Sequence, residues 1–286
     1  MDEEKLLVFK KSLLNGCNVK EAADKANIKY GSTYTIIKKY NLSTPNKNIR
    51  LIANGDYFND IDTEKKAYIL GFFIADGYIE KNSGRICFNN SIDDISVFRE
   101  IQEEICPNSK LHYSTKQTGV NLRKKQVLLR FTNKNITKIL DEKYDLTSGK
   151  TFNENYVFDF SKLSEDLIPH FIRGYFDGDG SVSYIPKTGK KQLLFNFSFV
   201  FNSELFANQF AEIFKNKFDI IPVIYSHIGK TCDYYSLRFN YNRIRKYKIE
   251  LIYKWLYNDA TIFLDRKKIK FEQYLNTEVN FRGNTL

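Results

Sequence analysis

The pattern of apolar and polar residues predicts a set of elements that occurs twice along the chain. Apolar residues at helical spacing favour helices over residues 92–105, 134–143, 203–217 and 243–256. Between them, alternating stretches bounded by turn residues favour strands over residues 77–90 (a pair), 110–115, 126–132, 180–185, 192–201, 221–227 and 233–241. A helical segment precedes each set. This order predicts an α+β fold of tandem pseudo-symmetric αββαββα repeats, each containing an antiparallel sheet.

The helical segment that begins each repeat keeps small residues at matching places. Residues 69–77 read ILGFFIADG, and residues 172–180 read IRGYFDGDG. Residues four apart share one helix face, so small side chains there let two helices approach closely. We expect these positions to form a helix interface: Gly71, Ala75, Gly174 and Gly178. We also expect both helices to end at the following glycines in the left-handed conformation, at Gly77 and Gly180.

Each helical segment also ends in an acid, Asp76 in the first and Asp179 in the second. A helix C-terminus carries partial negative charge, so two carboxylates brought together there repel each other. A divalent cation would relieve this repulsion, and hard oxygen ligands suit Mg²⁺. The competing interpretation is two ordinary core helices with glycine caps. It gives no reason for an acid at both unfavourable helix ends.

These residues resemble the LAGLIDADG family of homing endonucleases. The lead-in residues 58–68 and 168–174 resemble family members from bacteria and phages, and matching blocks cover about residues 56–275. The resemblance implies a monomeric, single-chain endonuclease that cleaves double-stranded DNA at a long pseudo-symmetric target. It implies catalytic roles for Asp76 and Asp179. Together with the backbone of Ala75 and Gly178, these acids would bind Mg²⁺, with Mn²⁺ able to substitute.

In relatives, a lysine that follows the last helix of a repeat lies near the active site. The resemblance therefore implies a catalytic role for Lys150, and the internal repeat extends this role to Lys267 after the last helix of the second half. Either lysine would neutralise charge or orient water at a scissile phosphate. The alternative is that both are surface lysines after a helix, where the dipole favours cations. Asp177 aligns with Ile74 of the first segment, which argues against a paired metal-binding role for Asp177.

The N-terminal region predicts a helix-turn-helix extension. Helices are expected over residues 4–15, 19–26 and 31–40, and residues 41–55 are expected to be a linker. The last helix would be the recognition helix, with candidate DNA contacts at Tyr30, Ser32, Thr33, Thr35, Lys38 and Lys39. A plain three-helix packing module is the alternative. The predicted domains are 1–45 for this extension, 46–160 for the first repeat and 161–286 for the second.

Charge points to a polyanionic partner. The chain has 44 Lys and Arg against 34 Asp and Glu, for a net charge of +10. The two predicted hairpin regions 105–140 and 182–203 carry lysines and arginines but no acid. A β-ribbon can read base edges in the DNA major groove. The predicted DNA-binding residues are Arg85, Asn89, Lys116, Arg123, Lys124, Lys125, Arg130, Lys187, Lys190, Lys191, Asn196 and Arg238, with Lys38 and Lys39 from the extension.

In each repeat, alternation places the candidate base-reading residues on one face of a strand. In the first repeat this set is Arg85, Cys87 and Asn89. In the second, the set is either Lys191, Leu193 and Phe195 or the opposite register Gln192, Leu194 and Asn196, and the sequence does not decide between them.

Other features narrow the class of protein. No apolar stretch is long enough to span a membrane, and the four cysteines lack metal-site spacing. We therefore expect reduced thiols and a cytoplasmic location in a bacterial or phage-infected cell. Two alternatives to the endonuclease remain. One is an intron maturase that binds RNA, and the other is a non-catalytic DNA-binding regulator on the same scaffold.

Overall fold

The computed structural model describes residues 2–14, 17, 19–40, 42, 53–81, 83–117, 123–146, 153–186, 193–229, 231–240 and 244–276. The chain forms two compact units, residues 1–52 and residues 53–286. Most of the predicted linker, residues 41 and 43–52, lies outside the described residues. The predicted three-domain division stays a prediction. Among the described residues, no helix has the length and apolar character needed to cross a membrane.

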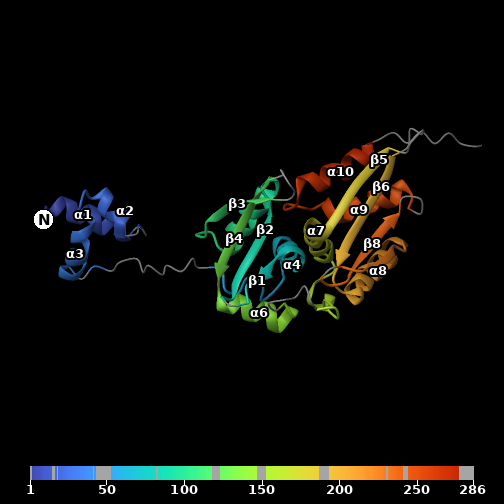
Figure 1. Cartoon of the computed structure of the whole chain (residues 1–286), viewed down its shortest axis with the longest axis horizontal. Coiled ribbons are helices and arrows are strands. Elements are labelled where there is room, and N and C mark those ends of the chain that lie inside the picture. Colours follow the sequence, from blue (N-terminus) through green and yellow to red (C-terminus); the bar gives the residue numbers. More distant parts are fainter. Residues whose placement is uncertain are drawn as a thin grey trace, which may run out of the picture. The chain divides into compact units, whose positions relative to one another are not determined.

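The N-terminal unit consists of three short helices (Figure 1). They are α1 (Glu3–Leu14), α2 (Val19–Lys25) and α3 (Thr33–Lys39), with a 3₁₀ turn over Tyr30–Ser32 before α3. Their apolar sides form a small core of Phe9, Leu13, Ala22, Ala23, Ala26 and Ile36. Lys38 and Lys39 are exposed at the end of α3.

The larger unit contains the two predicted repeats. The first comprises α4 (Glu64–Asp76), β1 (Tyr78–Ile79), β2 (Arg85–Ser91), α5 (Ile95–Ile105), β3 (Leu111–Gln117), β4 (Arg123–Thr132) and α6 (Lys134–Tyr144). The second comprises α7 (Ile168–Asp179), β5 (Gly180–Pro186), β6 (Leu193–Phe201), α8 (Glu204–Phe218), β7 (Val223–His227), β8 (Tyr234–Asn240) and α9 (Lys246–Tyr257). Their antiparallel sheets have equivalent strand orders, β1-β2-β4-β3 and β5-β6-β8-β7. The predicted α+β fold is confirmed.

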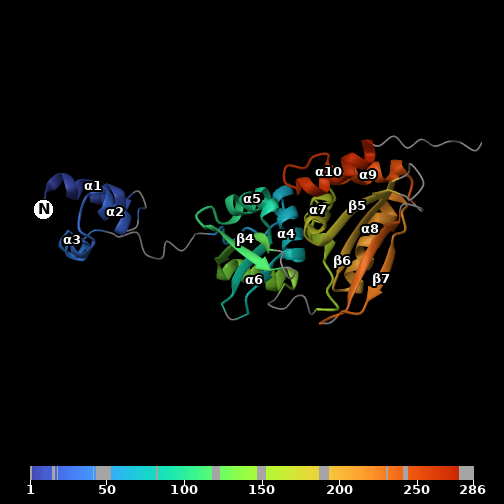
Figure 2. The same cartoon turned by 45° about the horizontal axis from the view of Figure 1, so that its top comes forward.

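One helix of the larger unit was not predicted. Residues Asp265–Asn276 form α10, which packs against β5 and α9 (Figure 2). Its sequence, DRKKIKFEQYLN, is highly charged, so the helical apolar pattern is weak. The predicted repeat ended one helix earlier, at α9.

The two repeats meet through α4 and α7, which lie side by side (Figures 1 and 2). A Cβ added to Gly71 would lie 2.1 Å from the carbonyl oxygen of Phe171 in α7. Reciprocally, a Cβ added to Gly174 would lie 1.9 Å from the carbonyl oxygen of Tyr68 in α4. Each glycine therefore admits the backbone of the opposite helix. This arrangement is the close contact expected from the small residues.

The glycines after the acids end the helices for a different reason from the one expected. Gly77 has φ −76° and ψ 155°, and Gly180 has φ −94° and ψ 161°, so both are extended rather than left-handed. A Cβ added to Gly77 would lie 2.1 Å from the ring of Phe73, and one added to Gly180 would lie 2.1 Å from the ring of Phe176. Any L residue can adopt this backbone conformation. Glycine is needed because the preceding helix turn places an aromatic ring against it.

Each sheet has one face in the core and one open face. Helix α5 packs on β4, and α8 packs on β6 and β8. In β6, the odd-numbered residues Phe195, Phe197, Phe199 and Phe201 are buried in an aromatic cluster, while Asn196 is exposed. In β2, Ile86 and Phe88 point into the core. The alternate residues of both strands therefore lie toward the open faces, although the candidate reader Cys87 is fully buried there.

Candidate metal centre and nucleic-acid interface

The two predicted acids end the two contacting helices, Asp76 in α4 and Asp179 in α7. The residues just before them touch, since a Cβ added to Gly178 would lie 2.3 Å from the Cβ of Ala75 and 3.4 Å from the backbone nitrogen of Asp76. Both carboxylates also act electrostatically on the buried hydroxyl of Tyr175, although burial is the main cause of its raised pKa. The two acids are therefore presented together where the helix pair ends.

Each acid has its own supporting contact. The Nδ2 of Asn90, near the end of β2, donates to Oδ2 of Asp76 at 2.8 Å. On the other side, Nζ of Lys267 donates to three backbone oxygens at the end of α7: Phe176 (2.5 Å), Asp177 (2.7 Å) and Gly180 (2.7 Å). Burial lowers the pKa of Lys267 to about 8, and nearby carboxylates, Asp177 first, oppose that shift.

Asp177 is buried and joins three segments. Its Oδ2 accepts hydrogen bonds from the Tyr68 hydroxyl of α4 at 2.7 Å and from the backbone nitrogen of Leu264 at 2.8 Å. Burial raises its pKa to about 6, although Lys267 and these two hydrogen bonds favour the charged form. Its contacts link α4, α7 and the segment before α10, which gives Asp177 a structural role beside Asp179.

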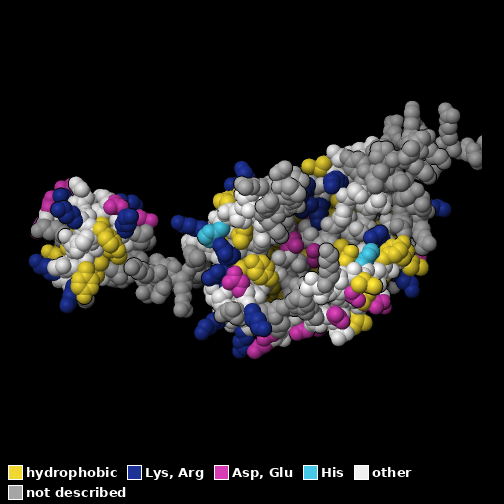
Figure 3. Space-filling model, in the orientation of Figure 1, with side chains coloured by type: hydrophobic (Ala, Val, Ile, Leu, Met, Phe, Trp, Pro, Cys, Tyr) yellow, Lys and Arg dark blue, Asp and Glu magenta, His cyan; other side chains and the backbone are white. Residues whose placement is uncertain are grey.

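The open sheet faces lie on either side of the helix pair. Figure 3 shows this side of the larger unit hollowed between the two halves, with acidic side chains in the hollow and basic ones near it. In the first sheet, cross-strand register aligns Asn89 with Leu128 and His112, and Cys87 with Arg130. In the second, Ser181, Ser198 and Arg238 align across three strands. Asn196 is exposed on this face, whereas Phe195 is buried on the other. Of the remaining candidate readers of this strand, Lys191 and Gln192 lie outside the described residues, as do the side chains of Leu193 and Leu194.

The family model described as a LAGLIDADG-like domain matches the chain twice, over residues 63–144 and 166–252. The chain belongs to the LAGLIDADG family. Each match covers one repeat, from the acidic helix through the sheet, and α10 lies beyond the second match. The sequence has no match among curated proteins.

Solved structures of this family are similar to the chain at low identity. The homing endonuclease I-WcaI bound to its DNA recognition sequence is 13% identical, with 82% of this chain and 96% of that chain covered and a TM-score of 0.47. I-GzeII in complex with its DNA target is 17% identical, with 73% and 86% covered and a TM-score of 0.44. The N-terminal LAGLIDADG domain of DUF199/WhiA is 13% identical, with 71% and 89% covered and a TM-score of 0.41.

We call α4 and α7 the LAGLIDADG helices. The residues at their ends fit a hard divalent cation. Within the described parts of the chain, no group of three or more His, Cys, Asp or Glu side chains could hold a metal ion. The side-chain donors here are thus two carboxylates, Asp76 and Asp179. Mg²⁺ is commonly bound through one or two carboxylates, with waters and substrate phosphates completing its coordination. The site fits such a shared ion rather than a metal enclosed by protein ligands.

Several predicted site residues cannot be placed at the site. Lys150, Lys187, Lys190 and Lys191 lie outside the described residues, as do the side chains of Lys116 and Arg123. Lys124 and Lys125 are both exposed, but alternation along β4 puts only Lys124 on the open face with Arg130. Arg85 lies on that face and pairs with Glu80 at 3.4 Å.

Sequence reasoning missed the residues that support the acids. Asn90 carries no motif, although alternation puts this polar side chain on the same face of β2 as the buried Ile86 and Phe88, which could have drawn attention to it. Arg266 donates to both carboxylate oxygens of the buried Asp94, at 2.8 and 3.0 Å. These two residues are 172 positions apart, and no local pattern indicates that they meet.

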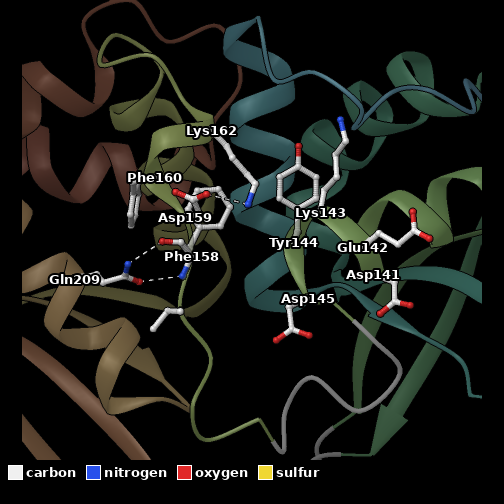
Figure 4. Close-up of a pocket in the computed structure, with 11 residues that line it drawn as sticks. Asp141, Glu142, Lys143, Tyr144, Asp145, Phe158, Asp159, Phe160, Lys162 and Gln209 are labelled. Atoms are coloured by element: carbon white, nitrogen blue, oxygen red, sulfur yellow. Dashed lines mark hydrogen bonds and ion pairs between the residues drawn. The ribbon is translucent and has the colours of Figure 1, made fainter.

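A separate groove lies elsewhere on the larger unit. It has a volume of about 440 Å³ and is lined by α6 and its end, residues 157–160 and 162, and Gln209 of α8 (Figure 4). Within it, the Gln209 side-chain amide accepts a hydrogen bond from the backbone nitrogen of Phe158 and donates one to its carbonyl oxygen. Lys162 forms an ion pair with Asp159 (Figure 4). None of its lining residues belongs to the sheets or to the LAGLIDADG helices, so this groove is separate from the acids.

Proposed function

We propose that the protein is a site-specific endonuclease that hydrolyses double-stranded DNA with Mg²⁺. The observation that carries this proposal is the position of Asp76 and Asp179, at the ends of two helices in backbone contact and between two open sheet faces. Each half supplies one acid and one reading face. Two phosphodiesters, one in each DNA strand, therefore match a site with two halves.

The protein side chains have separable roles in this reaction. When bound, the metal would activate water and stabilise the leaving oxygen. Asp76 and Asp179 would hold it, with the backbone of Ala75 and Gly178 beside them. Arg85, Asn89, Arg130, Asn196 and Arg238 on the open faces would contact bases and phosphates. Lys150 remains a candidate for charge neutralisation at the phosphate.

The two halves would read different sequences. Arg130 and His112 lie on the first open face, whereas Ser181, Ser198 and Asn196 lie on the second. Because the faces differ, we expect a pseudo-symmetric rather than palindromic target. One chain carries both halves, so a monomer would suffice for cleavage.

The decisive experiment is a selection from a randomised duplex library with the full chain and Mg²⁺. A nuclease should yield one long consensus and blunt or staggered double-strand ends at its centre. Selection of bound but uncut duplexes would instead indicate a regulator. The intron maturase is the RNA alternative, and both acids are compatible with it. Binding to structured intron RNA without any selected DNA would support it and contradict the proposal.

The assignment of the open faces can be tested with neighbouring lysines. Lys124→Ala should weaken DNA binding and reduce the log–log salt slope by about 0.9, the value expected for one lost phosphate contact. Lys125→Ala is the matched control, since it removes the same charge one residue away on the other face. Equal effects of the two substitutions would contradict the assignment of this face to DNA.

We further propose that the N-terminal unit is an accessory DNA-binding module of helix-turn-helix type. Its last helix exposes Tyr34, Thr35, Lys38 and Lys39. A protein beginning at Ala53 should fold and cut, because both acids and both sheets lie beyond that point. Its footprint should shorten at one end only and its salt slope should fall. An unchanged footprint and slope would leave the unit without a role in DNA binding.

A further inference from the structure

The segment from Leu256 to Lys267 joins both repeats to the helix that carries Asp179. It lies beyond the second match to the family model, which ends at residue 252. Its contacts reach the start of α4, the first repeat's 3₁₀ turn over Ile92–Asp94, and α7.

The first anchor of this segment is a buried ion pair. Arg173 of α7 is fully buried, and its Nη2 lies 2.6 Å from Oε1 of Glu64 at the start of α4. Its Nε and Nη1 donate to the carbonyl oxygens of Ile262 (3.0 Å) and Leu256 (2.6 Å). Glu64 in turn accepts from the backbone nitrogen of Thr261 at 2.6 Å. The segment is thereby fixed to both α4 and α7.

The second anchor is on α10. Arg266 forms a two-pronged pair with Asp94, whose side chain is 1% exposed. The planar guanidinium makes such a pair geometrically specific. This contact fixes the first turn of α10 to the first repeat. Lys267 is the residue that follows Arg266.

Lys267 then acts on the end of α7. An ammonium group has three N–H donors and no acceptor. All three are used by the carbonyl oxygens of Phe176, Asp177 and Gly180. These carbonyls flank Asp179, and that of Phe176 also accepts the backbone N–H of Gly180. With its donors used in this way, Lys267 determines where the last turn of α7 lies instead of contacting a phosphate.

The first repeat supports its acid in another way. Asn90 bonds the carboxylate of Asp76 itself. Two residues after each acid, Tyr78 pairs with Cys87 and Ser181 pairs with Ser198. Asn90 and the buried Phe201 each lie three residues beyond these partners, so they occupy equivalent positions. Phenylalanine has no amide to donate. The two halves therefore support equivalent acids with non-equivalent side chains.

We propose that Lys267 is a positioning residue for Asp179, anchored to the first repeat through Arg266 and Asp94, and that Asn90 is its counterpart for Asp76. This inference rests on the proposed nuclease function. Its consequence is that each support can be removed separately. Removing one should misplace one acid and slow the cleavage of one DNA strand more than the other.

The test is strand-resolved cleavage of a duplex selected with the wild-type protein, with a different dye on each strand. Lys267→Met and Asn90→Ala should each change the ratio of the two strand rates by about tenfold, in opposite directions, because a misplacement of about 1 Å can cost about a hundredfold in rate. Lys270→Met, which changes an exposed lysine on the same helix, should leave the ratio unchanged. A general loss of stability would slow both strands equally. Unchanged ratios in both Lys267→Met and Asn90→Ala would overturn the inference.

A second measurement needs neither DNA nor metal. Hydrogen exchange in Lys267→Met should become about tenfold faster at the end of α7, where a cation and the carbonyls stabilise each other. The equivalent turn at the end of α4 is the internal control and should not change. Equal exchange at α7 in variant and wild type would overturn the inference even if no duplex is cut. Absence of cutting by the wild type would overturn only the proposed function.

If Lys267→Met does not fold, Arg266→Gln provides the same test from the other end of the anchor. It removes the two-pronged pair with Asp94 while leaving the Lys267 ammonium in place. It should bias the same strand as expected for Lys267→Met, by a smaller factor. A bias toward the opposite strand, or none, would contradict the anchoring role.

Discussion

The two LAGLIDADG helices have nearly identical backbone contacts but different buried side chains. Gly71 and Gly174 each admit the opposite backbone, at 2.1 and 1.9 Å from an added Cβ. One residue before and three residues after this glycine, the first helix has Leu70 and Ile74, whereas the second has Arg173 and Asp177. The backbone contact sets where the acids lie, and the buried side chains determine what else each helix is joined to.

This difference shows how a duplicated fold can become asymmetric without losing its centre. The interface glycines are constrained by both halves at once, because each touches the partner backbone. Arg173 and Asp177 face the segment 256–264, which bonds the second helix directly. A charged pair and a buried carboxylate are tolerated there because this segment supplies the hydrogen-bond partners they require.

The largest effect on stability should come from breaking the buried pair. Arg173→Met leaves Glu64 and two backbone carbonyls without their partner, and we expect a loss of about 3–5 kcal/mol. Leu70→Met, at the equivalent position of α4, should cost less than about 1.5 kcal/mol because it conserves volume in an apolar site. Urea unfolding of both variants measures the contrast. Similar losses would show that the halves do not differ as described.

The second-largest effect on stability should come from the close glycine contact that the two helices share. Gly71→Ala and Gly174→Ala should each destabilise the protein by about 3 kcal/mol, the upper end of the usual overpacking cost, because the added methyl meets backbone. The two losses should be nearly equal. Gly31→Ala is the control, since a Cβ there has no neighbour within 4 Å. Thermal unfolding that is unchanged by either interface substitution would contradict the close helix contact.

The smallest effect is a pH dependence confined to the second half. His170 lies 2.8 Å from Nη1 of Arg173, and burial together with this cation lowers its pKa. Since the folded-state pKa is below that of the unfolded chain, the unfolded state binds more protons near pH 6. The contribution of His170 to stability should therefore be full above about pH 6.5 and be lost as the pH drops below it.

His170→Gln removes the titrating ring and keeps an acceptor for Arg173. It should flatten this part of the pH profile in urea unfolding. An identical profile in the variant would assign the pH dependence to other groups.

The sequence predicted the repeated architecture because that architecture follows from local signals. Small residues four apart, Asp-Gly helix ends and alternating strands are each visible within about ten residues. The strand register of β6 could not be chosen, because aromatic residues at 195, 197, 199 and 201 reveal their shared burial only when α8 and α10 pack on them. Glycine's role at Gly77 was misjudged because the ring of Phe73 is a packing feature, not a backbone preference.

The supports of the site were less predictable. Asn90 and Asp76 are 14 positions apart, while Arg266 and Asp94 are separated by 172. Such contacts depend on how α10 folds back onto both repeats, and the charged sequence of α10 gave little sign of a helix. Lys267 was found only as a lysine near a helix end, and its three carbonyl contacts required the structure.

The most direct test of the central claim is to remove one carboxylate at a time. Asp76→Asn and Asp179→Asn keep the shape of each side chain and remove its charge. On a duplex selected with the wild-type protein, each variant should bind with nearly unchanged affinity and make no double-strand break in the presence of Mg²⁺. The account predicts this loss for both acids, because a double-strand break requires both halves of the site. Full double-strand cleavage by either variant would contradict it.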